Sequence, residues 1–180
     1  MQLLLDFKAS LLAFMDSGGP VLWILFLLSL FLWSLIIERY WYFVWGYPRR
    51  LAEIQREWRA RSERSSWFAA KVRQAMIADV NLQLQRNLLL IKSLIAVCPL
   101  LGLLGTVTGM IHVFDVMTLL GNGNARAMAD GVSLATIPTM AGMVIALSGL
   151  FFSSYLERRV VLETQKAADS LRGYPGKTDA

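Results

Sequence analysis

Three stretches of this sequence carry no charged residue over a length that can cross a membrane, namely 17–37, 93–114 and 131–156. A bilayer core is crossed by about 20 apolar residues in helical form. The chain as a whole is 56% hydrophobic over 180 residues, which agrees with this pattern. We therefore predict an all-α integral membrane protein with three transmembrane helices, in preference to a soluble domain.

Basic residues gather in two of the segments that flank these stretches. Eleven Lys or Arg residues lie from Arg39 to Lys92 and five more follow Glu157, whereas the first seventeen residues hold only Lys8 and the segment 115–130 only Arg126. The positive-inside rule places both basic regions in the cytoplasm. We predict an outer N-terminus and an inner C-terminus. The net charge of +5 is then a topology signal, so no nucleic-acid partner is expected.

These patterns divide the chain into seven segments. Spacing of Leu4, Phe7, Leu11 and Phe14 predicts an outer interfacial helix, and the weak N-terminal charge without an A-x-A site argues against a signal peptide. The leucine-rich first span has no small-residue face and is expected to face lipid. The predicted order is an interfacial helix (1–19), the first span (20–45), a cytoplasmic helical region (46–92), the second span (93–119), an outer loop (120–130), the third span (131–156) and a cytoplasmic helical extension with a disordered tail (157–180).

The cytoplasmic region is expected to be helical. Leu51, Ile54 and Trp58 mark a short amphipathic helix, followed by a turn near Ser65. No Gly or Pro lies between Trp67 and Cys98, so we predict one helix from about residue 69 to residue 119 that projects into the cytoplasm. The helix after Glu157 also meets no breaker before Gly173.

The second and third spans are rich in small and hydroxyl residues, unlike the first. Gly102, Gly105 and Gly109 recur at three- and four-residue spacing, and the last two form a GxxxG pair that lets another helix approach closely. We therefore expect a homo-oligomer that a Gly105→Leu substitution disrupts. The second and third spans each contain a proline, which removes one backbone N–H donor from the helix. The remaining small and polar residues that we single out are Pro99 in the second span and Ser133, Thr136, Pro138, Thr139 and Gly142 in the third.

No residue pattern in the chain points to an enzyme, a metal site or a cofactor. His112 is the only histidine and Cys98 the only cysteine, and neither has a partner motif. The hydroxyls of Thr106 and Thr139 are the better candidates for function, because they lie at membrane depth. Two interpretations stay open for them: they line a polar path, or they simply bond to carbonyls one turn back in their own helices.

The motif PLLGLLGTVTGM at 99–110, followed by GVSLATIPTMAGMVIALSG at 131–149, resembles the two signature spans of the ExbB/TolQ/MotA family. Three spans and a large loop after the first resemble its ExbB/TolQ branch, in particular compact ExbB-type proteins. The resemblance implies a bacterial inner-membrane protein with a periplasmic N-terminus. It also implies a pentameric ring whose second and third spans line a pore, with the family's pore threonines at Thr106 and Thr139.

The resemblance further implies partners and a mechanism. An ExbD-like single-span protein would sit inside the pore, and the proton gradient would drive work on a TonB-like protein. Many ExbB and TolQ proteins carry a glutamate where this chain has Leu134, so a partner must supply the titrating carboxylate. The alternatives are a TolQ-like subunit serving envelope integrity and a passive membrane scaffold.

Overall fold

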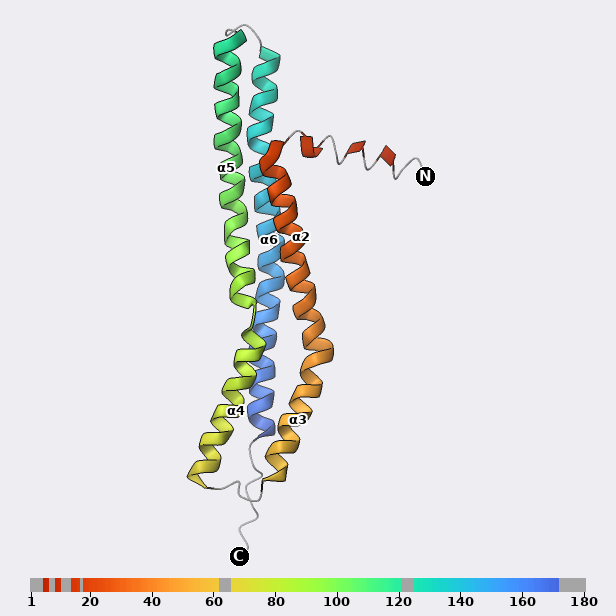
Figure 1. The fold of residues 1–180 in the computed structure, drawn as a ribbon, viewed down its shortest axis with the longest axis vertical. Coiled ribbons are helices and arrows are strands. Elements are labelled where there is room, and N and C mark those ends of the chain that lie inside the picture. The colour runs from red at the N-terminus through yellow and green to blue at the C-terminus, as the bar shows by residue number, and fades with distance from the viewer. Residues whose placement is uncertain are drawn as a thin grey trace, which may run out of the picture. The chain divides into compact units, whose positions relative to one another are not determined.

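A computed structural model describes residues 5–6, 9–10, 14–16, 18–61, 66–120 and 125–171 (Figure 1). Three helical stretches, Gly19–Ala60, Trp67–Thr118 and Gly131–Ser170, are long and apolar enough to cross a membrane. The predicted all-α class and the three candidate spans are thus confirmed for the described residues. The elements are α2 (Gly19–Trp41), the π-helical turn η1 (Tyr42–Gly46), α3 (Tyr47–Ala60), α4 (Trp67–Gln85), α5 (Leu88–Leu120) and α6 (Ala125–Ser170).

Several expectations from the sequence concern residues outside the described part of the chain. They are the interfacial helix, which rests on Leu4, Phe7 and Leu11, the turn at Ser65, the loop positions 121–124, and the tail 172–180.

The chain divides into two units, which are described separately. Unit 1 comprises Met1–Ser34 and Ile91–Phe151, and unit 2 comprises Leu35–Leu90 and Phe152–Ala180. Unit 1 therefore holds most of the three charge-free stretches, and unit 2 holds most of the basic residues.

Unit 1 is built from parts of α2, α5 and α6. Leu25 and Leu32 of α2 are fully buried, whereas Trp23 and Leu27 on the same helix are exposed. The expectation that the first span faces lipid is therefore wrong for one of its faces. The sequence of α2 could not show this, because the space for Leu32 is left by Gly149 of α6, which has no side chain. The core cluster of unit 1 is Met15, Val21, Leu22, Leu25 and Cys98, with Leu101, Ile137, Ala141, Ile145 and Ala146 packed against it.

Unit 2 contains the amphipathic helix that the sequence predicts. Ile54 and Trp58 of α3 are each only 4% exposed, and Leu84 of α4 and Leu156 of α6 are almost completely buried. Between α2 and α3 the chain forms η1, which the sequence analysis did not foresee. Here the Tyr47 N–H bonds to the Tyr42 carbonyl five residues back. Pro48 follows directly and has no N–H, so it cannot complete the ordinary helical ladder at this point.

The predicted continuous helix from residue 69 to residue 119 is broken in the structure. α4 ends at Gln85 and α5 begins at Leu88. Between them Arg86 has φ −51° and ψ 137°, and Asn87 has φ 64°. These angles match the central positions of a type II turn, which requires positive φ at its third residue. Asn tolerates that conformation far better than most residues, so the break needs neither Gly nor Pro.

α6 behaves as the sequence predicts beyond Glu157. It continues without interruption to Ser170, and it passes through Pro138 without breaking. Its first described residue, Ala125, precedes the expected start of the third span by six positions, because the helix begins inside the segment assigned to the outer loop.

Candidate functional site

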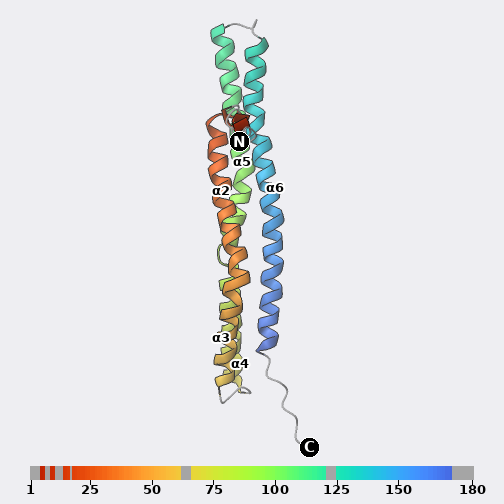
Figure 2. The same cartoon turned by 90° about the vertical axis from the view of Figure 1, so that its right-hand side faces the viewer.

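The site of interest is the contact between α5 and α6 in unit 1, where the two helices run side by side in both views (Figures 1 and 2). All three glycines of the predicted face, Gly102, Gly105 and Gly109, lie against α6 at this contact. A Cβ atom added to Gly109 would lie 2.5 Å from the Ala135 Cα atom, and one added to Gly105 would lie 2.5 Å from the Pro138 Cβ atom. A Cβ atom on Gly102 would lie 2.9 Å from the Pro138 carbonyl oxygen. The α5 glycine face therefore lies directly against α6.

The approach is reciprocal, because α6 contributes glycines of its own. A Cβ atom on Gly142 would lie 2.6 Å from the Cys98 carbonyl oxygen, and one on Gly131 would collide with the Val113 side chain. Only residues without a side chain permit backbones to pack this closely. The glycine face is thus covered by α6 of the same chain. The close packing expected at Gly105 and Gly109 thus occurs against a helix of the same chain, and the homo-oligomer stays a prediction.

The threonine hydroxyls of this contact fall into two kinds. The Thr139 Oγ1 atom donates to the Gly102 carbonyl at 2.7 Å, which joins α6 to α5. The Thr106 Oγ1 atom donates to the Leu103 carbonyl at 2.7 Å, within its own helix. Thr136 likewise donates to the Ser133 carbonyl at 3.3 Å. The local bonding that the sequence analysis kept open therefore holds for Thr106 and Thr136, and Thr139 instead bonds across the interface.

Pro138, next to Thr139, packs directly against the glycine face of α5. Its ring is almost completely buried and fills the space above Gly105. Without an N–H it leaves the Leu134 carbonyl without the usual helical donor. Pro99 lies inside α5 and is only partly buried. The two prolines are accommodated within continuous helices.

A cavity of about 310 Å³ opens beside this contact. It lies at the start of α2, where Gly19 has φ +65°. Leu134 and His112 are among the residues that line it. The lining is mostly apolar. Among the described residues, no group of His, Cys, Asp or Glu side chains could hold a metal ion. Its lining residues are Gly18, Gly19, Pro20, Val21, Gly105, Thr108, His112 and Leu134.

The second lone residue singled out from the sequence has a structural role. Cys98 is buried, and its thiol donates to the Leu94 carbonyl one turn back at 3.3 Å. Neither Cys98 nor His112 meets a second group with which it could perform acid–base or nucleophilic chemistry among the described contacts.

Unit 2 contains polar contacts that sequence reasoning missed. Arg39 is 3% exposed and donates to the carbonyls of Gln83 and Leu84, both at 2.8 Å. The Tyr47 hydroxyl donates to the Glu163 carbonyl at 2.9 Å, and burial raises the pKa of Tyr47 to about 12. The acceptors are all backbone carbonyls, which no sequence pattern distinguishes.

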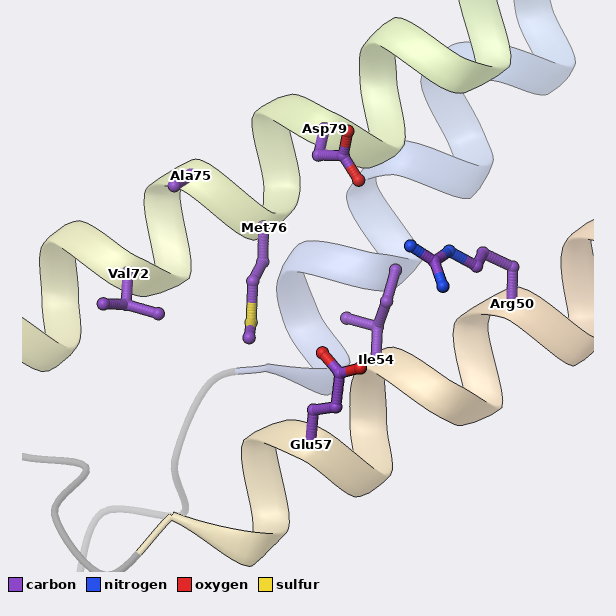
Figure 3. Close-up of a pocket in the computed structure, with 7 residues that line it drawn as sticks. All are labelled: Arg50, Ile54, Glu57, Val72, Ala75, Met76 and Asp79. Atoms are coloured by element: carbon purple, nitrogen blue, oxygen red, sulfur yellow. The ribbon is translucent and has the colours of Figure 1, made fainter.

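Arg73 makes a third contact of this kind, because its Nη2 atom donates to the Ala168 carbonyl at 2.9 Å. Unit 2 also has a cavity of about 290 Å³ between α3 and α4 (Figure 3). Its apolar wall comes mainly from Ile54, Val72 and Met76, and charged side chains such as Glu57 and Asp79 lie around it.

The region that contains the α5–α6 contact matches a known protein family. A sequence model of the MotA/TolQ/ExbB proton channel family matches residues 49–168, which include α5 and nearly all of α6. The chain belongs to this family. The resemblance of the two signature spans is thus confirmed, and the α5–α6 contact lies within the family's shared region.

Relatives with ExbB names support an ExbB-type member of the MotA/TolQ/ExbB family. The putative biopolymer transport protein ExbB-like 3 of Synechocystis is 33% identical over 105 residues, or 54% of this chain and 50% of the relative. The biopolymer transport protein ExbB of Helicobacter pylori is 34% identical over 87 residues, or 48% of this chain and 60% of the relative. The chain thus spans less than two thirds of these relatives. No solved structure matches it.

Proposed function

We propose that this protein is an ExbB-type subunit of a bacterial inner-membrane motor, which uses the proton gradient to energise TonB-dependent outer-membrane transport together with an ExbD-like partner. The observation that carries the proposal is the family match across α5 and α6, the two closely packed helices that carry Thr106 and Thr139 in their charge-free stretches. In this proposal α5 and α6 line the pore of a ring, taken to be a pentamer.

The proposed division of labour follows from the absence of an acid in the charge-free stretches. Hydroxyl groups such as those of Thr106 and Thr139 can relay a proton, but they do not titrate near neutral pH. Leu134 replaces the family carboxylate, and Asp115 lies beyond the charge-free stretch of α5. The partner's carboxylate would therefore bind and release the proton, with Thr106, Thr136, Thr139 and Ser133 as its polar surroundings. Each proton that crosses 100 mV releases about 2.3 kcal/mol for this work.

Reconstitution in liposomes under an imposed pH gradient tests the proposal. We expect little proton flux through this chain alone and clear flux when an ExbD-like partner is added. Replacing the partner's membrane aspartate with asparagine is expected to abolish that flux. Robust flux through this chain alone, or flux that survives the asparagine variant, would contradict the proposed role.

The proposed orientation has a separate test. In a Cys98→Ala background, cysteine introduced at Asn124 is expected to react with an impermeant thiol reagent from the periplasmic side. Cysteine at Ser65 is expected to react only after the membrane is permeabilised. The reverse pattern would refute the orientation taken from the basic segments.

Two other functions remain as alternatives. A passive scaffold is favoured by the local hydrogen bond of Thr106 and by the apolar Leu134, because neither contributes a titrating group. A scaffold would show no partner-dependent flux in the liposome assay. A TolQ-like subunit would conduct protons but serve envelope integrity, so deletion would cause detergent sensitivity and leave TonB-dependent iron or vitamin uptake intact.

A further inference from the structure

The break between α4 and α5 lies where the sequence favours a continuous helix. The stretch from Trp67 to Cys98 contains neither Gly nor Pro, and its residues are mostly good helix formers. Yet α4 ends at Gln85, and a type II turn at Arg86 and Asn87 precedes α5. An interaction from outside this stretch must therefore favour the break.

Arg39 of α2 supplies that interaction. In an uninterrupted α-helix the Gln83 carbonyl would accept the Asn87 N–H, and the Leu84 carbonyl would accept the Leu88 N–H. In the structure both carbonyls instead accept from the Arg39 Nη2 atom at 2.8 Å. The guanidinium thus takes the acceptors that the next helical turn would use, and its positive charge favours the carbonyl end of α4.

The environment of Arg39 strengthens this contact. The side chain is 3% exposed, and its guanidinium carbon lies 5.2 Å from the centre of the Tyr42 ring. A buried guanidinium that lost its acceptors would be costly, so the contact and the break support each other. Gln83 and Leu84 lie 44 and 45 positions after Arg39 in the sequence, and all three residues belong to unit 2.

The buried positions on either side of the break permit a continuous helix as well. Leu84, Leu88 and Ile91 are each at most 5% exposed, and they are spaced four and three residues apart. That spacing is the one an uninterrupted helix needs to keep a single buried face. Closing the break would therefore leave the same apolar residues on the same face.

We propose that the joint between α4 and α5 is a two-state element, which Arg39 holds in its broken form and which closes into one continuous helix when the guanidinium is withdrawn. Asn87 is the second determinant, because the broken form needs its positive φ. This inference does not depend on the proposed transport function.

Hydrogen–deuterium exchange of the full-length protein in lipid nanodiscs tests the proposal. In the Arg39→Met variant, we expect the amides of Asn87 and Leu88 to exchange about fivefold more slowly or slower still, because each gains a helical hydrogen bond. Arg39→Lys keeps a charged donor and is expected to retain the wild-type exchange. Adding Asn87→Gly to Arg39→Met is expected to restore the faster exchange.

A merely structural role for Arg39 predicts the opposite sign. If Arg39→Met left these amides unchanged or made them exchange faster, the two-state proposal would be wrong. Should that variant fail to fold, Asn87→Ala and Asn87→Gly decide with Arg39 in place. Slower exchange in the alanine variant alone would support the proposal, and equal exchange in both would overturn it.

Discussion

The two units of this chain hold their helices together by different means. In unit 1 the contacts are made by residues with little or no side chain, such as Gly102, Gly109 and Ala135, and by the short hydroxyl of Thr139. In unit 2 long side chains such as those of Arg73 and Tyr47 cross between helices and donate to backbone carbonyls. Large apolar residues, among them Trp58, fill the remaining space.

The difference agrees with the surroundings that the charge pattern predicts, namely lipid for the charge-free stretches of unit 1 and water for the basic unit 2. Lipid tails are as apolar as leucine, so burying leucine between two helices in a membrane gains little, and close backbone packing takes over. In water, apolar burial stabilises by about 25 cal/mol per Å², so large side chains are useful. A single helix, α6, packs in both ways, through small residues in its charge-free stretch and through larger side chains after Glu157.

The largest expected effect comes from breaking the small-residue mode. Gly109→Leu places a side chain where even a Cβ atom would lie 2.5 Å from the Ala135 backbone. We expect the variant to lose at least about 3 kcal/mol of stability, seen as loss of folded protein and a lower Tm in detergent. Val107→Leu, two residues away and 52% exposed, is the matched control and should leave the Tm unchanged. A wild-type Tm for Gly109→Leu would show that α5 and α6 do not pack as described.

The next effect concerns the charged crossing in unit 2. Arg73→Met removes the bond to the Ala168 carbonyl and keeps most of the apolar stem. Hydrogen bonds that involve a charged group contribute about 1.5–3 kcal/mol, and Arg73 is only half-buried, so we expect a loss near the lower value. Chemical unfolding monitored by tryptophan fluorescence would measure it. Lys71→Met is the control, since Lys71 is exposed and only lies over the Trp67 ring.

A smaller loss is expected for Tyr47→Phe, which deletes one neutral hydrogen bond to the Glu163 carbonyl. We expect about 1 kcal/mol in unfolding experiments, and no change for Tyr40→Phe, because Tyr40 is 54% exposed.

The pH dependence of this bond has a defined sign. Because the folded pKa of Tyr47 is raised to about 12, the contribution of its hydroxyl is fully present below the unfolded pKa of about 10 and is lost as pH rises through the folded pKa. The difference between the wild type and Tyr47→Phe should therefore be constant from about pH 6 to 9. Above about pH 10 the difference should shrink, because the unfolded state then loses the hydroxyl proton before the folded state does. A difference that stayed constant or grew above about pH 10 would contradict the raised pKa.

The smallest effect on stability should come from the threonines. Thr139→Val removes the bond to the Gly102 carbonyl, and interhelical bonds of this kind average about 0.6 kcal/mol in membranes. Thr106→Val should cost even less, since its hydroxyl bonds within α5. If the proposed function is right, both variants lose energised transport while protein level and oligomeric state stay normal. Full transport in both variants would mean that the hydroxyls only support the fold.

Much of this protein is determined by its sequence alone. The charge-free stretches indicate three apolar helices, because a single apolar segment of about 20 residues can satisfy all its backbone hydrogen bonds within a membrane by forming a helix. The glycine spacing in α5 and the small residues of α6 likewise predict a close contact between helices. The signature motifs of the two spans indicate the family. These features are local, so they can be read without knowing what lies opposite.

Only the tertiary structure decided which partner each local feature meets. The Gly105 face could have served another copy, but Pro138 of the same chain fills it. The sequence does not distinguish Thr106 from Thr139. In the structure the Thr106 hydroxyl donates to a carbonyl of its own helix, whereas the Thr139 hydroxyl donates to a carbonyl of another helix. The break at Asn87 went unforeseen because Arg39, more than forty residues away, takes the carbonyls that would have continued the helix. Backbone carbonyls are the same in every residue, so only the folded chain shows which of them a distant donor will reach.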